Sequence, residues 1–320
     1  MWELPIVSLS LIILSIGYLK LADHFNIIDK PNQRSSHTVP TIRGGGILFL
    51  FALWLFFIKD FSYPYMILGA TIIAIVSFVD DIKTLSSNFR LPFQFLAMAL
   101  VLVELQFDAF LWVLPLLIAM VAFMNIYNFM DGINGITVSY SLAIILSVLC
   151  INNREQLIRQ DLLYYLLISL IVFGFYNFRK KARFFAGDIG SITIAVVISF
   201  LILTYMVGFS TPIFLLWFAV YGVDGCLTVF YRKLIGEKIT EPHRKHIYQK
   251  LVDVYKTPHL TISLIYGVGQ LLIGGIVFLV YRESITLQIA VLVGVLLVLV
   301  ACYVILFKRI ESAKKTRIDA

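Results

Sequence analysis

Apolar segments long enough to cross a bilayer recur along this chain, and they exclude most other folds. A membrane-spanning helix needs about 20 predominantly apolar residues. Of the 320 residues, 60% are hydrophobic and only 14% are charged, whereas soluble proteins carry about 25% charged residues. The sequence therefore predicts an all-α, polytopic integral membrane protein. We find no internal repeat and no separate soluble domain, so residues 1–320 are expected to form one helical bundle.

Eleven segments are candidate spans, and two of them, 45–58 and 162–176, are short enough to suit a buried or re-entrant segment instead. The prediction is therefore ten or eleven transmembrane helices. The three cysteines lie singly in apolar segments, too dispersed for a metal site or a disulfide framework, and we expect them to be buried. The candidate spans are 4–21, 45–58, 64–79, 92–107, 109–124, 133–151, 162–176, 189–206, 211–230, 260–280 and 285–307.

The basic residues predict the orientation of these spans. If the N-terminus lies outside and the C-terminus in the cytoplasm, all but four of the 26 lysines and arginines face the cytoplasm, as the positive-inside rule requires. The net charge of +7 then belongs to one face. It suits anionic lipid headgroups and phosphorylated substrates better than nucleic acid. The long connections that would face the cytoplasm, and that hold nearly all the chemistry, are 22–44, 80–91, 125–135, 177–191 and 231–259.

Adjacent carboxylates, Asp80 and Asp81, end the predicted span 64–79. A carboxylate at membrane depth costs at least ~2.5 kcal/mol, and adjacent side chains on a helix point in different directions. The pair is compatible with a hydrated helix end, with metal or metal–phosphate binding, or with a general base. Arg90 follows in the same connection.

Three oxygen-bearing side chains, Asn125, Asn128 and Asp131, follow at intervals of three residues, and Gly132 comes next. On a helix they would share one face. Such a row suits a hard cation or a diphosphate, and it is also compatible with an ordinary polar helix end.

Glycines mark two further segments of the same face. Asp188 lies between Gly187 and Gly190, where it suits either a helix cap or the close approach of a metal-bound phosphate. Arg43 precedes three consecutive glycines and provides a cation in a flexible segment.

The longest connection contains His243, Arg244 and His246. The two histidines would share a face if this segment were helical, and an arginine can clamp a phosphate with two hydrogen bonds. A zinc site would need further ligands nearby, so sugar-phosphate recognition is the better functional interpretation. A basic loop against lipid headgroups is the alternative. Asp224 is expected to pair with Arg232.

Together these segments resemble the polyprenyl-phosphate N-acetylhexosamine-1-phosphate transferase family, over about the first 260 residues. The motif that begins at His243 is more similar to the branch that initiates O-antigen and enterobacterial antigen than to the lipid I branch. The matching motifs are Arg43-Gly-Gly-Gly, Asp80-Asp81, Asn125-x-x-Asn128-x-x-Asp131-Gly132, Gly187-Asp188-x-Gly190-Ser191, Asp224-x-x-x-Thr228-x-x-x-Arg232 and His243-Arg-x-His246-x-Tyr248-Gln249.

The resemblance implies an enzyme of the bacterial inner membrane whose active site faces the cytoplasm. It would move a sugar-1-phosphate from a UDP-N-acetylhexosamine to a polyprenyl phosphate, such as undecaprenyl phosphate, and so initiate a cell-surface polysaccharide. Mg²⁺, or Mn²⁺ in its place, would be the cofactor. The partners would be these two substrates and the membrane, without nucleic acid, and the oligomeric state stays open.

The resemblance also implies roles for individual residues. Asp188 and Asn128 would hold the metal, while Asp80 and Asp81 would lie near the acceptor phosphate, one of them as a base. The substrate-binding residues would be Arg43, Arg90, Asn125, Asp131, Asn134 and Arg244, and the catalytic set would include His243 and His246 beside the two aspartates. Two departures matter: Thr84 stands where some members have a third aspartate, and Asn134 stands where many bacterial members have aspartate, which leaves its contact with uracil or diphosphate open.

Two other classes fit the composition less well. A transporter of an anionic solute or lipid would use intramembrane acids as coupling sites, but these polar residues gather at one face and no inverted repeat is visible. A membrane prenyltransferase would need two aspartate-rich motifs, and Asp80–Asp81 supplies half of one.

Overall fold

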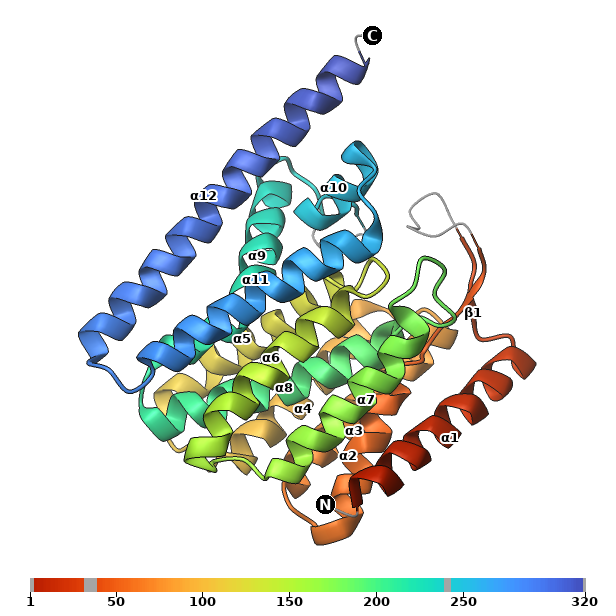
Figure 1. Cartoon of the computed structure of the whole chain (residues 1–320), viewed down its shortest axis with the longest axis vertical. Coiled ribbons are helices and arrows are strands. Elements are labelled where there is room, and N and C mark those ends of the chain that lie inside the picture. Colours follow the sequence, from red (N-terminus) through yellow and green to blue (C-terminus); the bar gives the residue numbers. More distant parts are fainter. Residues whose placement is uncertain (1–2, 32–38, 239–242, 319–320) are drawn as a thin grey trace.

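The structure is a computed structural model that describes residues 3–31, 39–238 and 243–318, with the side chains of the last helix described as far as residue 314. Parts of the connections 22–44 and 231–259 lie outside these ranges. The described residues form α-helices, one 3-10 helix and one two-stranded antiparallel sheet, which confirms the predicted all-α class (Figure 1). The elements are α1 Glu3–His24, β1 Ile28–Asp29, β2 Thr41–Ile42, α2 Ile47–Asp60, α3 Pro64–Ile82, α4 Ser87–Glu104, α5 Phe110–Phe129, α6 Ile136–Glu155, α7 Gln160–Asn177, α8 Gly187–Phe209, η1 Pro212–Phe218, α9 Ala219–Leu234, α10 Ile247–Tyr255, α11 His259–Val280 and α12 Ile285–Ile318.

Each predicted span falls on a helix. Within the described residues, nine helices are long and apolar enough to cross a membrane, with η1 and α9 counted as one. The other two predicted spans correspond to α2, which has 14 residues, and α4, which has 18. The short segment 162–176 belongs to α7, which is one of the nine.

Helix α8 lies at the centre of the bundle, and α12 lies along one edge (Figure 1). Residues on every face of α8 are apolar or small, as expected for a helix that is surrounded by others, and its first five turns are almost wholly buried. By contrast, α12 is mostly exposed and extends past the bundle toward the C-terminus. The polar site described below lies at the N-terminal end of α8.

A close contact between glycines fixes the start of α8 against the start of α2. A Cβ atom on Gly46 would lie 2.1 Å from the Cα of Gly190, so no larger residue fits at this position. Strand β2 extends the contact, because the backbone N–H of Phe185 donates to the carbonyl of Ile42 at 2.8 Å. As a result, Arg43 is held beside the first turn of α8.

The cysteines correct one expectation. Cys150, Cys226 and Cys302 are free, but all three are exposed on the surface of the bundle rather than buried. In a bilayer such an outward position carries no hydrophobic penalty, because lipid tails are as apolar as the protein interior.

Candidate active site

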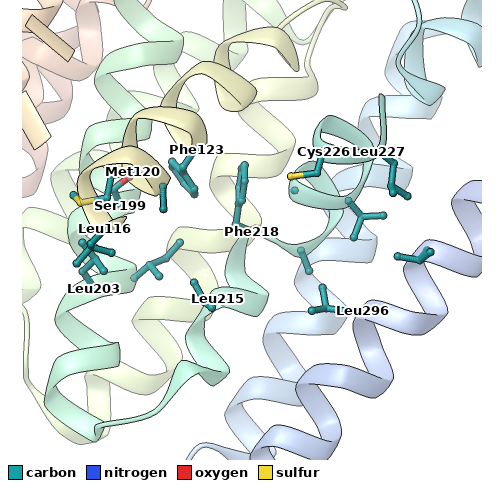
Figure 2. Close-up of a pocket in the computed structure, with 16 residues that line it drawn as sticks. Leu116, Met120, Phe123, Ser199, Leu203, Leu215, Phe218, Cys226, Leu227 and Leu296 are labelled. Atoms are coloured by element: carbon teal, nitrogen blue, oxygen red, sulfur yellow. The ribbon is translucent and has the colours of Figure 1, made fainter. Parts of the chain in front are cut away.

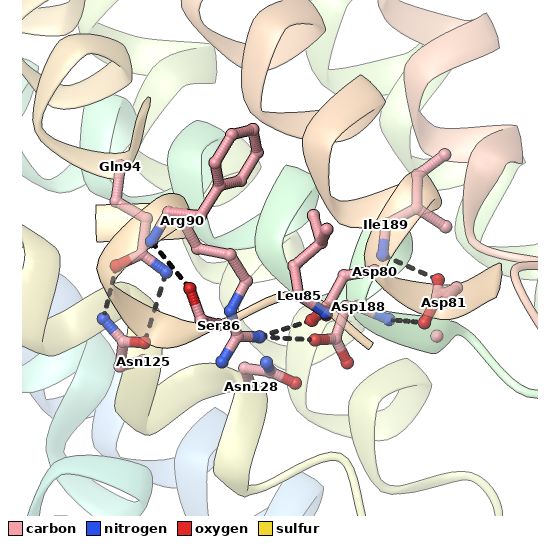
Figure 3. A network of polar contacts seen from close by, with 12 residues as sticks. Asp80, Asp81, Leu85, Ser86, Arg90, Gln94, Asn125, Asn128, Asp188 and Ile189 are labelled. Carbon is pink, nitrogen blue, oxygen red and sulfur yellow. Dashed lines mark hydrogen bonds and ion pairs between the residues drawn. The ribbon is translucent and has the colours of Figure 1, made fainter. Parts of the chain in front are cut away.

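Five charged side chains meet where α3 ends and α8 begins. Figure 3 shows four of them, Asp80, Asp81, Arg90 and Asp188. Asp188 lies between two arginines: Arg43 Nη2 is 3.1 Å from its Oδ1, and Arg90 Nη1 is 3.1 Å from its Oδ2. Arg43 Nε also contacts Asp81 at 2.7 Å, and Arg90 Nη1 contacts Asp80 at 2.5 Å. Three carboxyl groups and two guanidinium groups therefore share one cluster.

Asp81 caps the N-terminus of α8 from a different helix. Its Oδ1 accepts from the backbone N–H of Asp188 at 2.8 Å, and its Oδ2 accepts from that of Ile189 at 3.1 Å. Its side chain is 0% exposed. Gly187 makes this contact sterically feasible, because its φ is +71° and a Cβ there would lie 2.4 Å from Asp81 Oδ2. The position favours a structural role for Asp81 and leaves Asp80 as the carboxylate of the pair that is closer to the surface.

The expected row of polar residues on α5 is divided among different neighbours. Asn125 forms a reciprocal amide pair with Gln94 of α4, at 2.9 and 3.3 Å. Asn128 lies beside α8, where its Oδ1 accepts from Ser191 at 3.1 Å. Asp131 follows the end of the helix at Phe129, so it does not continue the helical face predicted from the spacing.

Asp131 is surrounded by protein at the base of this cluster. Its Oδ1 accepts a hydrogen bond from Thr137 at 2.5 Å. Burial, and then the charge of Asp188, raise the pKa of Asp131 to about 6, although Thr137 and Arg43 act in the opposite direction. Asp131 therefore changes its charge close to physiological pH, which is common for carboxylates in functional sites.

The oxygen donors of this cluster suit a hard divalent cation. Asp188 and Asn128 present carboxylate and amide oxygens from adjacent helix ends, and each carboxylate has about four lone-pair positions, of which the arginines use a part. Mg²⁺ needs one or two carboxylates, with substrate oxygens and waters completing its shell. No group of three His, Cys, Asp or Glu side chains arranged for a metal occurs in the part of the chain that the structure describes, so a closed, all-protein cage such as structural zinc occupies is not a feature of these residues.

His246 begins α10 and lies fully inside the protein. Its Nδ1 is 3.3 Å from Asp224 Oδ1, and Asp224 also accepts from the backbone N–H of Ile247 at 3.0 Å and from the Tyr266 hydroxyl at 2.7 Å. The expected pair between Asp224 and Arg232 is therefore wrong. Asp224 turns instead toward the start of α10, where three donors converge.

Arg232 pairs with Glu237, at 3.1 Å. Arg232 lies in the last turn of α9 and Glu237 lies just beyond it, so the chain folds back toward the end of α9. Because Arg232 pairs with Glu237, the Asp224 carboxylate can accept from the start of α10.

His243 lies against His246, although residues 243–245 are not helical. The two rings are 4.9 Å apart, and the His243 ring meets Phe129 edge-on at 6.2 Å. Burial lowers the pKa of His243 to about 3, and the charges of His246 and Arg232 act in the same direction. The ring is therefore neutral at physiological pH and serves as a hydrogen-bonding group rather than as a cation.

Arg244 is directed to α10. Its Nε and Nη2 bind both carboxylate oxygens of Asp253, at 2.9 and 2.6 Å. This bidentate pair holds the His243 segment on α10, and it occupies two of the donor groups that were expected to clamp a phosphate.

Asn134 helps to form a cavity of about 550 Å³, which is also lined by Thr41, two residues before Arg43. Its Nδ2 donates to the carbonyls of Arg179 and Lys180, at 2.8 and 3.2 Å. Phe185 and Lys181 also line this cavity. We did not single out either residue from the sequence, although the basic run 179–183 and the aromatic pair before Gly187 were visible signals.

A second cavity, of about 360 Å³, lies deeper among α5, α8, α9 and α12, and its lining is almost wholly apolar (Figure 2). Phe123 and Met120 of α5 line one side of it, Leu203 of α8 lies behind them, and Leu296 of α12 lines the other side.

The chain is similar in sequence to known transferases. The model of glycosyl transferase family 4 matches residues 63–206, which contain Asp80, Asn128 and Asp188. The chain is also 25% identical, over 292 residues, to a probable undecaprenyl-phosphate N-acetylglucosaminyl 1-phosphate transferase of Bacillus subtilis. This match covers 82% of the chain and 80% of the relative. Both matches support glycosyl transferase family 4. They indicate a membrane-embedded glycosyl-1-phosphate transferase, and the family match ends before the segment of His243 and His246.

Proposed function

We propose that this protein transfers a sugar-1-phosphate from a UDP-N-acetylhexosamine to undecaprenyl phosphate, in a reaction that depends on Mg²⁺. An oxygen of the lipid phosphate would attack the sugar-bearing phosphorus of the donor. The new phosphorus–oxygen bond gives polyprenyl-diphospho-sugar, and the bond that breaks releases UMP. The observation that carries this proposal is Asp188, a carboxylate held between Arg43 and Arg90 at the start of α8, with Asn128 beside it on the same turn of the helix through Ser191.

The polar cavity suits the nucleotide. Its volume of about 550 Å³ lies within the usual 300–1,000 Å³ of small-ligand sites. Phe185 provides an aromatic surface for a base, Asn134 provides an amide, and Lys180 and Lys181 provide cations for phosphate. Both hydrogens of the Asn134 amide are used by the carbonyls of Arg179 and Lys180, so this residue would serve uracil through its Oδ1, as an acceptor for an N–H of the base.

The apolar cavity suits part of the lipid chain. It is lined by aliphatic and aromatic side chains of several helices, and it lies in the membrane-spanning part of the bundle. An isoprenoid gains free energy from such a surface in proportion to the apolar area that it covers. Its phosphate would then lie near Asp80 and Arg90, where the cluster opens at the ends of α3 and α4.

The chemistry follows from the charges that must meet. Arg43 and Arg90 neutralise the two anionic substrates, and preorganised donors of this kind stabilise the charge that develops in the transition state. Asp188 and Asn128 would hold Mg²⁺, which when bound polarises phosphoryl oxygens. Asp80 would position the acceptor phosphate and accept its proton when that phosphate arrives as the monoanion.

The histidine pair suits the sugar. In the neutral His243 ring, Nδ1 accepts from the backbone N–H of Lys245 at 3.3 Å, which leaves Nε2–H as a donor for a sugar hydroxyl or the acetamido oxygen. His246 is fixed through Asp224, while its Nε2 is buried without a hydrogen-bond partner among the described residues. A sugar hydroxyl that donates a hydrogen bond to this nitrogen would remove the free-energy cost of leaving it buried and unsatisfied.

The proposed location is the bacterial inner membrane, with the site facing the cytoplasm, where nucleotide sugars are made. The branch that initiates O-antigen or enterobacterial antigen stays a prediction, as does the identity of the hexosamine.

A panel of radiolabelled UDP-sugars tests the proposal. Membranes that contain the protein are incubated with each sugar, undecaprenyl phosphate and Mg²⁺, and the label in the lipid phase is counted. Transfer from at least one UDP-N-acetylhexosamine, with release of UMP, is the expected result. Absence of lipid-linked label with every sugar, while a parallel assay detects movement of an anionic solute across the membrane, would instead support a transporter.

A further inference from the structure

A groove separate from both cavities runs along the lipid-facing side of α6, between α7 and α11. It encloses about 620 Å³. Its floor is formed by Val138, Leu142 and Leu146 of α6, while Phe175 of α7 and Val268 of α11 stand on either side. In Figure 1, α6 lies between α11 and α7. This surface takes no part in the proposed transfer reaction.

Two glycines explain why this surface is hollowed. A Cβ on Gly174 would lie 3.0 Å from a methyl group of Val138, and one on Gly267 would lie 2.8 Å from Ser139. Both glycines therefore let their helices approach α6 closely. The larger side chains on α7 and α11 then project beyond α6, and Phe175 and Val268 remain 62% and 52% exposed.

A cation lies at one end of the groove. Arg179 follows the end of α7, and its guanidinium lies 4.4 Å from the centroid of the Phe175 ring. Its Nε donates to the Phe175 carbonyl at 2.6 Å. Its two terminal nitrogens have no hydrogen-bond partner among the described residues. The side chain is therefore held in place while its remaining donors stay available to a ligand.

The dimensions of the groove match one leaflet. From Val138 to Leu146 the floor rises by about 12 Å, at 1.5 Å per residue, and half of the hydrocarbon core of a bilayer is about 15 Å. Because α6 begins at the same face as the active site, the groove starts at that surface beside Arg179 and ends near the middle of the membrane.

We propose that this groove binds an anionic phospholipid from the leaflet on the active-site face. One acyl chain would lie on α6, and the phosphate would accept hydrogen bonds from Arg179. The basic run 179–183 adds three more cations and no acid, so an anionic headgroup is favoured over a zwitterionic one. A polyprenyl chain is much longer than a groove of about 12 Å, which makes the acceptor lipid the poorer match.

The site has a direct connection to the nucleotide cavity. The carbonyls of Arg179 and Lys180 hold the side chain of Asn134, which lines that cavity. A lipid that fixes Arg179 would therefore also stabilise the position of Asn134. The binding proposal does not depend on the reaction, because it concerns a different surface and can be measured without substrates.

Native mass spectrometry of the purified protein, titrated with phosphatidylglycerol or with phosphatidylcholine of the same acyl chains, tests the proposal. The wild type should bind phosphatidylglycerol more tightly than phosphatidylcholine. Arg179→Gln should weaken the binding of phosphatidylglycerol about fivefold, the effect of one interfacial cation. It should weaken the binding of phosphatidylcholine less, because that headgroup has the phosphate but no net charge. Arg309→Gln removes an exposed cation at the end of α12 and is the matched control, for which no change is expected.

A second variant tests the groove itself. Leu142→Trp fills the floor and should abolish binding of both lipids; if it lowers the melting temperature, Val268→Trp on the exposed wall takes its place. Equal affinity of wild type and Arg179→Gln for phosphatidylglycerol would overturn the proposal. So would one-for-one displacement of phosphatidylglycerol by polyprenyl phosphate. A lipid-free dimer that cross-links through Phe175→Cys would show that a second copy occupies the groove.

Discussion

Asp188 is the residue on which the proposed chemistry most depends. Asp188→Asn keeps the shape of the side chain but removes its charge, and we expect transfer to fall to near the detection limit at any practical Mg²⁺ concentration. Asp188 does not cap α8, whose first backbone N–H groups donate to Asp81, so membrane insertion and folding should be retained.

Activity of Asp188→Asn is measured as lipid-linked label, beside wild-type protein treated with EDTA and then with Mg²⁺ or Mn²⁺. Wild-type transfer should disappear with EDTA and return with either metal. An active variant, or wild-type transfer that resists EDTA, would contradict the assignment and leave Asp80 as the next candidate ligand.

Asp131 provides a prediction on pH. Because its folded pKa, about 6, lies above the usual value near 4, the folded state holds this proton more tightly than the unfolded state does. The contribution of the protonated Asp131 carboxyl to the free energy of unfolding is therefore fully present below about pH 4, and it is lost as the pH rises to about 6. Asp131→Asn never acquires the charge, so it avoids this loss, which amounts to no more than about 3 kcal/mol.

The measurement is the melting temperature of Asp131→Asn and of the wild type in detergent, at intervals from pH 4 to pH 7. We expect the variant to gain stability relative to the wild type as the pH rises. A constant difference across this range would show that Asp131 has an ordinary pKa. Comparing the two proteins at each pH removes most of the contribution of other groups.

Residue types in the site were visible in the sequence, but their partners were not. Asp80, Asp81 and Asp188 were predicted to share one face of the membrane, and the structure brings them together. That Asp81 accepts from the backbone of α8 depends on the packing of α3 against α8, over a separation of about 100 residues, and no local pattern encodes it. The same applies to Asp224. Its partner His246 follows α9 by a long connection, and local sequence propensity does not predict how that connection folds back onto Asp224.

At the scale of elements, the cap that α3 provides to α8 leads to a further prediction. Asp81→Asn replaces one acceptor by a donor that faces the N–H groups of residues 188 and 189, and it removes the charge that Arg43 pairs with. Leaving such buried groups unsatisfied costs about 1–3 kcal/mol each. We therefore expect Asp81→Asn to lower the melting temperature more than Asp80→Asn does, and activity to fall with it.

The two variants separate positioning from chemistry. Melting is followed by tryptophan fluorescence, and transfer is measured below the melting temperature of both proteins. Asp80→Asn should lose transfer by ~10²-fold or more with a smaller change in melting temperature. Equal melting temperatures would show that the cap on α8 contributes little to stability.

The positions of the helices along the chain were the most predictable feature of the elements, because a bilayer-spanning segment is recognised by its hydropathy. Their ends were less predictable, since α12 continues to Ile318, past the predicted end at residue 307. The 3-10 turn η1 and the short helix α10 were not anticipated. Each begins at a local cap, Thr211 for η1 and His246 with Gln249 for α10. Tertiary contacts then hold both starts, because Thr211 donates to Gln288 and the N–H of Ile247 donates to Asp224.

For the whole molecule, the charged side chains at the two ends of the bundle differ in their surroundings. At the end opposite the site, Lys59 contacts Glu3 at 2.6 Å and Asp161 at 3.0 Å, and Arg282 contacts Glu155 at 2.6 Å. At the site, arginines and carboxylates gather beside cavities that can admit ligands. The positive-inside rule assigns the end with more basic residues to the cytoplasm, which is where a nucleotide sugar would be available.

This orientation is tested with single cysteines at two exposed positions. Asn153 ends α6 at the face opposite the site, and Lys238 follows α9 at the face of the site. Because the three native cysteines are exposed and free, and Cys150 lies on the same helix as Asn153, they are first replaced by alanine. In intact cells a membrane-impermeant maleimide should label Asn153→Cys, whereas Lys238→Cys should be labelled only after the membrane is permeabilised.

Labelling of both positions from the same side would contradict the span map. Reversed labelling would place the site outside the cell, where the proposed nucleotide donor is absent, and would therefore refute the proposed reaction as well as the orientation.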